Sequence, residues 1–491
     1  MYARILKLAS HTAVYGLGSV ASKVIAIVLL PIYVAYLDPQ SFGIAETVLV
    51  VNLFAAAMFR LGMQNAMMRF FYDTPVDERD EVGVRVVRTS LALTLISTVV
   101  GCLLLGLFAH PLAAFFLNDS RRDKFIWLAA LGMLASILYS TLTATFRLEQ
   151  RPQAFLAISL GNVILSGGLS LFFITSLGWG VEGLLLGNFL GYLVMVPVAA
   201  LMQRRYIVPI IDRALVKPML RFALPTIPMA IAYQSLTLID RTLISRIEGL
   251  DQVGIYGVAG RFASVVLLAV TALQLSWQPF AYSIKDDDEA RRSYAIVTSW
   301  FAAIMGWLVA GIALLAEPVV RVMTVSAYFE AARLVPLLAL SGAVYGVYFL
   351  VGIGASRVKR TGWHVAVAFG AVVVSLGANL ALIPMFGAMG AAVSAVLANG
   401  ALAGFMLLRS QRVFRVDYEL GRIARPVALT AVAIVAAYAL PGGDSLAVWV
   451  TRVALALAWP VALMATGFAT PGERLRIVNL VTGRTDKEAA A

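Results

Sequence analysis

Residues 154–191 read AFLAISLGNVILSGGLSLFFITSLGWGVEGLLLGNFLG, which is two apolar runs that meet at a glycine-rich turn. The pattern recurs at 363–400 as WHVAVAFGAVVVSLGANLALIPMFGAMGAAVSAVLANG. Before the turn the aligned pairs are Gly161 and Gly370, Ser166 and Ser375, and Ile174 and Ile383. After a shift of two residues at the turn they are Gly180 and Gly387, and Gly183 and Gly390. Runs of this length and polarity are typical of helices that cross a bilayer. The sequence therefore predicts that the same helical hairpin occurs at 154–191 and again at 363–400.

A weaker repeat appears earlier in each half, where Phe42-Gly43-Ile44 resembles Val253-Gly254-Ile255. Both repeats pair a span with the span six places later, so the two halves share one orientation. This predicts two six-helix lobes around a central cavity, related by a pseudo-twofold axis along the membrane normal, plus two C-terminal helices. The alternative is that small-residue helix pairs resemble one another through packing alone.

The composition of the whole chain excludes a soluble protein. Of 491 residues, 60% are hydrophobic and 13% are charged, whereas a typical globular domain is about 45–50% apolar and about 25% charged. Apolar windows bounded by charge, Pro or Gly predict about fourteen transmembrane helices and an all-α integral membrane fold. The expected spans are 10–37, 42–65, 89–110, 125–146, 154–176, 180–202, 221–245, 252–283, 294–316, 331–355, 362–384, 388–408, 425–441 and 446–469.

Cysteine and histidine are scarce, which argues against disulfide and metal chemistry. Cys102 is the single cysteine and lies inside an apolar run, and His11, His110 and His364 are far apart in the sequence. We expect no metal site and no cofactor, with H⁺ or Na⁺ as the candidate coupling ion.

Lys and Arg predict the orientation of the spans. With the N-terminus inside, 28 of the 39 Lys and Arg residues fall in inner segments and 5 in outer loops. Cytoplasmic loops collect basic residues, so both termini are expected in the cytoplasm. The same asymmetry accounts for most of the net charge of +12 without a nucleic-acid partner.

The expected organisation has five parts. They are an N-terminal six-helix lobe (1–205), a cytoplasmic interfacial linker (206–220), a C-terminal six-helix lobe (221–412), an additional helix pair (413–470) and a cytoplasmic tail (471–491).

Polar side chains inside the spans concentrate on the first two helices of each predicted lobe. The candidates for binding substrate in the cavity are Lys23, Arg60, Arg241, Arg261, Gln274 and Gln278, and those for coupling an ion are Glu46 and Asp240. A cation held in hydrocarbon is expensive, so a water-filled cavity is the cheaper environment for it. More basic than acidic groups in such a cavity favour an anionic substrate, because Arg and Lys suit phosphate oxygens.

Each of these residues also has a structural interpretation. Arg241 could pair with Asp240 or extend to the surface, and Arg60 could extend to the inner boundary. Arg333 and Arg452 lie near the ends of spans and are expected at the interface. The asparagines within spans, such as Asn379, are expected to bond between packed helices rather than to a ligand.

Two segments carry a resemblance to a known family. Leu224–Ser283 resembles Wzx-type polysaccharide flippases through Asp240-Arg241, Gly254-Ile255-Tyr256 and Trp277-Gln278-Pro279-Phe280, and Tyr15–Glu46 is similar to the first hairpin of that family. In topology the resemblance covers most of the chain, but these motifs lie in two hairpins only. The family belongs to the multidrug/oligosaccharidyl-lipid/polysaccharide exporter superfamily.

The resemblance implies a flippase of the bacterial inner membrane. Its substrate would be an undecaprenyl-pyrophosphate-linked oligosaccharide, carried to the outer leaflet for polysaccharide, lipopolysaccharide O-antigen or exopolysaccharide synthesis by alternating access. Lys23, Arg241 and Arg261 match the cavity cations of the family. Its expected partners are membrane lipid and, downstream, a polysaccharide polymerase and chain-length proteins. Many members stop at twelve spans, so the extra pair leaves the subfamily open.

Three alternatives stay open from the sequence. A lipid II flippase would need a more basic cavity, and a multidrug/cation antiporter would need acidic residues deep in the first lobe, where Glu46 is the sole candidate in spans one to four. A membrane-embedded polymerase or acyltransferase would need a large outer loop or an intramembrane histidine. The outer loops are short and the histidines lie near span ends, so we expect no enzyme.

Overall fold

A computed structural model describes residues 23–208, 210–358, 362–443, 445–470 and 472–473 of the chain. These residues form helices joined by short loops, with no β-strand among them. The predicted all-α fold is therefore confirmed.

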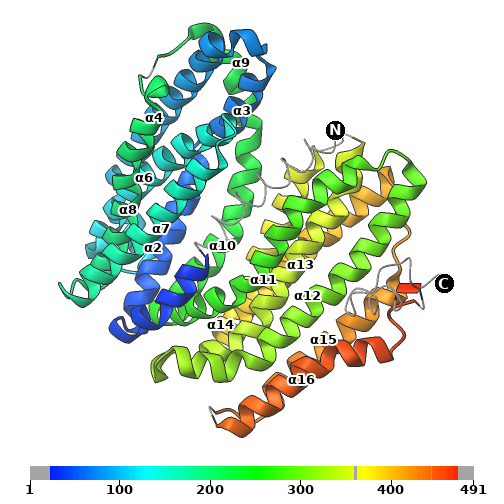
Figure 1. Cartoon of the computed structure of the whole chain (residues 1–491). Helices are drawn as coiled ribbons and strands as arrows, with labels where there is room; N and C mark the ends of the chain where they lie inside the picture. Colours follow the sequence, from blue (N-terminus) through cyan, green and yellow to red (C-terminus); the bar gives the residue numbers. More distant parts are fainter. Residues whose placement is uncertain (1–22, 209, 359–361, 444, 471, 474–491) are drawn as a thin grey trace.

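The helices fall into two lobes and a C-terminal pair (Figure 1). The first lobe contains the first helix (Lys23–Tyr36), α2 (Pro39–Phe59), α3 (Met63–Asp73), α4 (Val84–Leu107), α5 (Ala109–Phe116), α6 (Asp123–Leu148), α7 (Pro152–Thr175) and α8 (Gly180–Met202). The linker forms a short amphipathic helix, α9 (Arg213–Ala223), which packs on α3 and α4. The rest comprises α10 (Ile227–Ile247), α11 (Leu250–Ser283), α12 (Asp287–Met323), α13 (Ala331–Arg357), α14 (Trp363–Val413), α15 (Leu420–Ala439) and α16 (Leu446–Ala465).

The described helices agree with the predicted number of spans. Twelve helical segments are long and apolar enough to cross a membrane, and the first helix adds a shorter apolar one. α14 consists of two arms, because its backbone leaves the helical region at Gly387 (φ 57°, ψ −140°). Counting both arms gives fourteen spans, as predicted. Positions 10–22 of the predicted first span lie outside the described residues.

α12 is longer than the predicted span 294–316. Its N-terminus is capped by Asp286, whose carboxylate accepts a hydrogen bond from the Glu289 backbone N–H at 2.8 Å. Three acidic residues in the first turn favour a helix start at this point, because they face the positive end of the helix dipole. At its other end the helix continues through Pro318 to Met323.

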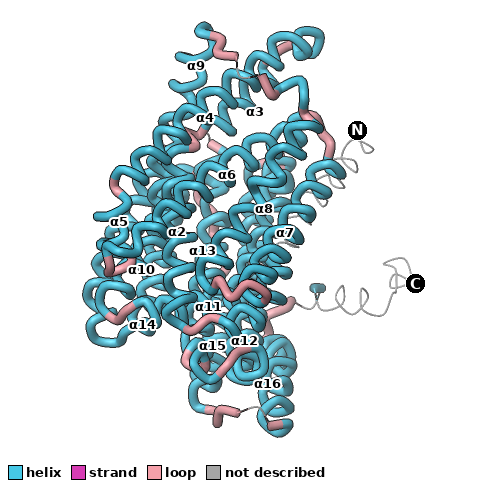
Figure 2. The backbone as a smooth tube through the Cα atoms, turned by 90° about the vertical axis from the view of Figure 1, so that its left-hand side faces the viewer, coloured by secondary structure: helices cyan, strands magenta, loops and turns pink. Residues whose placement is uncertain are grey.

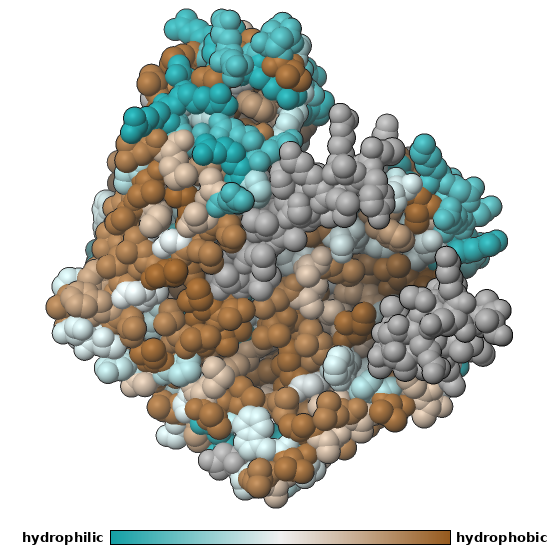
Figure 3. Space-filling view, in the orientation of Figure 1, coloured by the Kyte–Doolittle hydropathy of each residue, from teal (hydrophilic) through white to brown (hydrophobic). Residues whose placement is uncertain are grey.

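The two lobes meet at one end of the molecule and diverge at the other (Figure 1). α2 of the first lobe packs against α10 and α11 of the second. The ends of α3 and α9 and the start of α12 lie at the diverging end, which we call the basic end because the Lys- and Arg-rich segments gather there. Hydrophilic residues cover the basic end of both lobes, and a mostly hydrophobic belt lies below them (Figure 3).

The contact between the lobes has the reciprocity of a twofold axis. A Cβ atom added to Gly43 would lie 1.7 Å from the Leu250 carbonyl oxygen, and one added to Gly254 would lie 2.0 Å from the Pro39 carbonyl oxygen. In each contact the carbonyl oxygen belongs to the residue four positions before that lobe's own glycine, since Leu250 precedes Gly254 and Pro39 precedes Gly43 by four. The backbones can approach this closely only because neither residue has a side chain. This is the predicted pairing of the Gly43 and Gly254 repeats.

The repeated hairpins have matching turns. Gly180 (φ 54°) and Gly387 (φ 57°) both have left-handed backbone conformations that favour glycine. After each turn comes a close helix contact, since a Cβ atom on Gly183 would lie 3.2 Å from Ile174 N, and one on Gly390 would lie 2.9 Å from Ile383 N.

One part of the expected packing needs correction. We expected Gly161 and Gly370 to close these helix pairs. An added Cβ atom on Gly370 would lie 3.0 Å from the Phe405 ring of the other arm, which is a close contact, but one on Gly161 would meet only the end of the Met195 side chain at 3.4 Å. The close approaches to backbone atoms are those that follow the turn.

The C-terminal pair packs on the second lobe, away from the first lobe (Figures 1 and 2). Both α15 and α16 contact α12. Beyond α16, Glu473 ties the chain back to these helices: its carboxylate accepts hydrogen bonds from Arg422 Nη2 at 2.6 Å and from Trp300 Nε1 at 3.1 Å. Burial alone would raise the pKa of the Glu473 carboxyl, but the hydrogen bonds from Arg422, Thr470 and Trp300 outweigh it and lower the pKa to about 2.

We expect this attachment to stabilise the fold at neutral pH and to weaken in acid. A carboxyl whose pKa is lower in the folded state adds stability above its unfolded pKa, near 4.5, and loses it as the pH falls towards 2. Glu473→Gln should cost about 1 kcal/mol at pH 7, because the bonds are charge-assisted but partly exposed. Thermal unfolding in detergent should show this difference at pH 7 and a smaller one at pH 3. A difference that grows in acid would contradict this account.

Candidate functional site

An ion pair joins the two lobes where they meet. Arg261 of α11 donates two hydrogen bonds to Glu46 Oε1 of α2, from Nη2 at 2.7 Å and from Nε at 3.2 Å. The Arg261 guanidinium also lies over the Phe42 ring, 4.8 Å from its centroid. The Arg261 and Glu46 side chains are only 20% and 12% exposed. The pair is therefore a largely desolvated link between the lobes.

This pair corrects the role expected for Arg261. The sequence predicts a cation in the cavity that is available to substrate, but in the structure Glu46 of the opposite lobe neutralises it. The pair also gives Glu46 a cationic partner, so Glu46 is not a free acid available for ion coupling in this conformation.

Other polar contacts between the lobes lie at the same end. The Tyr328 hydroxyl of the second lobe donates to the Leu37 carbonyl at 2.7 Å, and Ser245 Oγ donates to the Phe116 carbonyl at 3.2 Å. Asn118 donates to the Ser245 carbonyl. Together with the Glu46–Arg261 pair, these contacts close the end opposite the basic end.

The second lobe contains a cavity of about 450 Å³ beside this closure. α10, α11, α13 and α14 enclose it, and its polar lining is Tyr233, Gln234, Thr237, Asp240, Arg241, Tyr256, Ser264, Ser341, Tyr345, Ser375 and Asn399. Aliphatic residues of α11, α13 and α14 complete the wall. The cavity thus has polar groups on all four of its helices, and its two charged groups lie on α10.

Asp240 is buried at one wall of the cavity, with 6% of its surface exposed. Its Oδ1 accepts a hydrogen bond from Asn379 Nδ2 at 2.9 Å, and its Oδ2 accepts one from the Tyr256 hydroxyl at 3.2 Å. No Lys or Arg nitrogen in the described residues lies within 4.0 Å of this carboxylate. Asp240 is therefore a buried acid held by neutral donors.

Arg241 lies in the same cavity but has no nitrogen within 4.0 Å of the Asp240 carboxylate, which excludes the ion pair that was one of its two structural interpretations. Its guanidinium lies 5.1 Å from the Tyr256 ring centroid. Its Nε is buried and has no hydrogen-bond partner among the described residues, and the same holds for Asn379 Oδ1. Buried polar atoms are nearly always paired, so unpaired ones beside a cavity indicate space for a ligand.

The other candidates are spread along the lobes. Arg60 ends α2 towards the basic end of the first lobe, where its Nε is buried without a partner among the described residues. Lys23 is the first residue of the described part of the chain and is partly buried. Along α11, Gln274 is partly buried and Gln278 is exposed. The structure therefore brings Arg241 and Asp240 together in one cavity and places Lys23, Arg60, Gln274 and Gln278 elsewhere.

Sequence reasoning missed one residue that holds Asp240. Tyr256 was noted only within a turn, but its hydroxyl donates to the Asp240 carboxylate. The expectation that Asn379 bonds between packed helices is confirmed, because it joins α14 to Asp240 of α10. Arg452 was expected at the membrane interface, and the structure shows that it is buried within the protein, with 2% of its surface exposed. Among the described residues, no three His, Cys, Asp or Glu side chains gather as they would around a metal ion.

Known proteins share this sequence pattern and architecture. A family model described as "Polysaccharide biosynthesis protein" matches residues 35–333. The solved structure of a lipid II flippase, MurJ, in an inward closed conformation is 12% identical, with 92% of this chain and 98% of that chain covered and a TM-score of 0.69. No curated protein sequence matches the chain.

Two solved structures of multidrug resistance MATE family transporters of the MOP superfamily are also similar. The inward-facing one is 14% identical, covers 83% of this chain and 96% of its own, and has a TM-score of 0.65. The outward-facing one is 16% identical, covers 84% of this chain and 96% of its own, and has a TM-score of 0.62. At such low identity these likenesses show a shared fold.

Proposed function

The chain belongs to the polysaccharide biosynthesis protein family, and from this premise we propose that it is a flippase for a polyprenyl-pyrophosphate-linked oligosaccharide. It would carry this lipid from the inner to the outer leaflet of the bacterial inner membrane. The observation that carries the proposal is Arg241, a cation with no carboxylate partner in the described residues, in a cavity beside the junction of two like lobes.

The charge of the cavity favours an anionic headgroup. Arg241 presents a guanidinium, and guanidinium groups bind phosphate oxygens through paired hydrogen bonds. Serine, threonine, asparagine and tyrosine groups around it suit sugar hydroxyls, while the aromatic rings offer faces for sugar rings. In this proposal Arg241 holds the pyrophosphate, the sugar occupies the space between the lobes, and the prenyl tail stays in the bilayer.

The proposed orientation follows from the basic end. Cytoplasmic segments are rich in Lys and Arg, so the diverging end would face the cytoplasm, with both termini on that side. The lobes would then be closed at the outer end by the Glu46–Arg261 pair and the Gly43–Gly254 contact. In this state the protein would be ready to load substrate from the inner leaflet, and opening at the outer end would release it.

Asp240 is the proposed site for the coupling ion. A buried carboxylate with no cation within 4.0 Å in the described residues can gain a proton or Na⁺ at little structural cost. Asn379 Oδ1, which lacks a donor, would offer a second oxygen to Na⁺. Occupation of Asp240 would also change the field at the neighbouring Arg241, and so link ion binding to release of the anionic headgroup.

Two other substrates of the same fold are the competing proposals. A lipid II flippase is supported by the structural likeness to a protein of that function. A cation antiporter is supported by the buried acid Asp240. The family match favours the oligosaccharide lipid, which would be delivered to a polymerase and chain-length proteins for O-antigen or exopolysaccharide synthesis.

Reconstitution into liposomes tests the proposal. We expect protein-dependent movement of a fluorescent polyprenyl-pyrophosphate oligosaccharide between leaflets, detected as protection from a membrane-impermeant quencher. Arg241→Gln should slow this movement by about tenfold, the effect of losing one charge-assisted contact. Arg425→Gln, which changes an arginine bonded to the Gly467 carbonyl outside the cavity, is the matched control. Movement of lipid II or export of a cationic dye, without movement of the oligosaccharide lipid, would overturn the proposal.

A further inference from the structure

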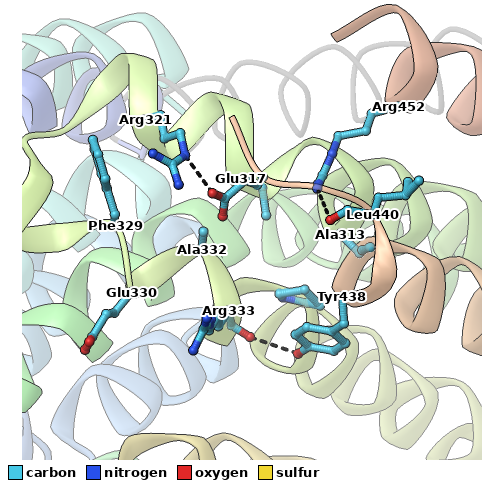
Figure 4. Close-up of a pocket in the computed structure, with 14 residues that line it drawn as sticks. Ala313, Glu317, Arg321, Phe329, Glu330, Ala332, Arg333, Tyr438, Leu440 and Arg452 are labelled. Carbon is cyan, nitrogen blue, oxygen red and sulfur yellow. Dashed lines mark hydrogen bonds and ion pairs between the residues drawn. The ribbon is translucent and has the colours of Figure 1, made fainter. Parts of the chain in front are cut away.

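A second polar pocket lies at the outer end of the C-terminal pair, away from the transport cavity. It has a volume of about 510 Å³ and is enclosed by α12, α13, the end of α15 and α16. Figure 4 shows Glu317 and Arg321 on one side, Arg452 above Leu440 on another, and Arg333 with Tyr438 below them. None of these residues takes part in the function proposed above.

The pocket contains more positive charge than its own carboxylates balance. Arg321 is engaged, because its Nε donates to Glu317 Oε1 at 2.6 Å. Arg333 is exposed and has no carboxylate within 4.0 Å in the described part of the chain. The Tyr438 hydroxyl donates to the Arg333 carbonyl at 2.8 Å, and both residues line the pocket. Glu330, the other acid of the lining, is exposed.

Arg452 raises the free-energy cost of this excess positive charge, because the residue is only 2% exposed. Its Nη1 donates to the Leu314 carbonyl at 2.8 Å, and its Nη2 donates to the Leu440 and Pro441 carbonyls at 3.3 and 3.2 Å. These acceptors are neutral, and Nε has no hydrogen-bond partner among the described residues. Glu317 lines the same pocket, but none of its oxygens lies within 4.0 Å of the Arg452 guanidinium. A buried guanidinium without a directly paired carboxylate is expensive, and an anion in the pocket would compensate it.

An apolar pocket of about 420 Å³ adjoins the polar one along α12, and Ala316 lines both. Its walls come from α11, α12, α13 and α16, and include Trp307, Leu308 and Leu457. A ligand that fills both pockets has an anionic head and a hydrocarbon chain. A soluble anion would fill only the polar part.

We propose that this pair of pockets binds an anionic membrane lipid through its phosphate headgroup. The phosphate would lie between Arg333 and Arg452, and an acyl chain would run along α12 beside Trp307. Guanidinium groups suit phosphate oxygens, and Arg321 stays occupied by Glu317. The site would attach the C-terminal pair to the bilayer at this end of the molecule. It does not depend on which substrate the central cavity carries.

Lipid titration of the full-length, delipidated protein, followed by native mass spectrometry, tests the site. The probes are phosphatidylglycerol, zwitterionic phosphatidylcholine and inorganic phosphate. We expect phosphatidylglycerol to bind most tightly and Arg333→Gln to weaken it about tenfold. Arg452→Gln should weaken it at least as much. Arg246→Gln removes an exposed cation in the last turn of α10 and should leave binding unchanged.

Several results would overturn the proposal. Phosphatidylglycerol binding that survives Arg333→Gln would exclude the pocket. Because Arg333 is exposed, this variant should fold, and it tests the site even if Arg452→Gln does not fold. Equal weakening by Arg246→Gln would indicate non-specific attraction to surface charge. If inorganic phosphate competes with phosphatidylglycerol at equal concentration, the site recognises a free anion rather than a lipid.

Discussion

Reversing the charge of Arg261 should nearly stop transport, and reversing Glu46 in the same protein should restore most of it. Arg261→Glu would place two carboxylates at a contact that now buries one ion pair. Breaking a buried pair costs about 3–5 kcal/mol, which shifts the balance between two conformations by about 10²- to 10⁴-fold. We expect the single variant to open at the outer end. It should lose at least about 99% of the flipping rate.

The double variant Glu46→Arg with Arg261→Glu separates the role of the pair from damage to the fold. Its lobes can form the same contact with exchanged charges, so flipping in liposomes should recover to within about tenfold of the unmodified protein. Arg246→Glu, an exposed change near the Phe115 ring, is the control and should have little effect. Normal flipping by the single variant would show that the pair does not hold the lobes together.

Asp240→Asn should remove the response of transport to an imposed ion gradient. The substitution keeps the shape and one acceptor oxygen for Asn379 or Tyr256, but it removes the charge that would bind Na⁺ or a proton. We expect a flipping rate about 100-fold lower than normal in the presence of a gradient. Without a gradient, the variant and the unmodified protein should differ much less.

The measurement compares liposomes with an imposed Na⁺ gradient, with an imposed pH gradient and with neither. Asp251→Asn changes an exposed acid in the first turn of α11 and is the matched control. An Asp240→Asn variant that still accelerates in either gradient would assign the coupling ion to another group. Protein levels in the membrane should be equal for both variants.

Local sequence patterns were sufficient to predict the spans and the repeat. The length of an apolar stretch decides whether its helix can cross the bilayer. A positive φ at a turn decides which position requires glycine. Gly180 and Gly387 could therefore be paired from sequence, and they share a positive φ. The same physics located the break that divides α14 into two arms. The helix contact at Gly161 was misjudged because small residues also occur where little space is required.

Pairing of charges could not be predicted in the same way. Glu46 and Arg261 are 215 positions apart, and their contact depends on how two lobes dock rather than on any local pattern. Asp240 and Asn379 likewise meet only through the packing of α10 on α14. Arg452 lies near the end of its span, and its burial by the packing of α16 on α12 likewise depends on contacts between distant segments.

The central claim is that the two lobes open alternately at the basic end and at the outer end. Electron–electron distance measurements on two spin-label pairs in liposomes test it most directly, in a Cys102→Ser background. One pair, at Asp77 and Glu289, spans the basic end, and the other, at Leu177 and Met385, spans the outer end; all four residues are exposed. The account predicts that substrate lipid or Arg261→Glu shortens the first distance and lengthens the second in the same population. Distances that change together, or do not change, would contradict it.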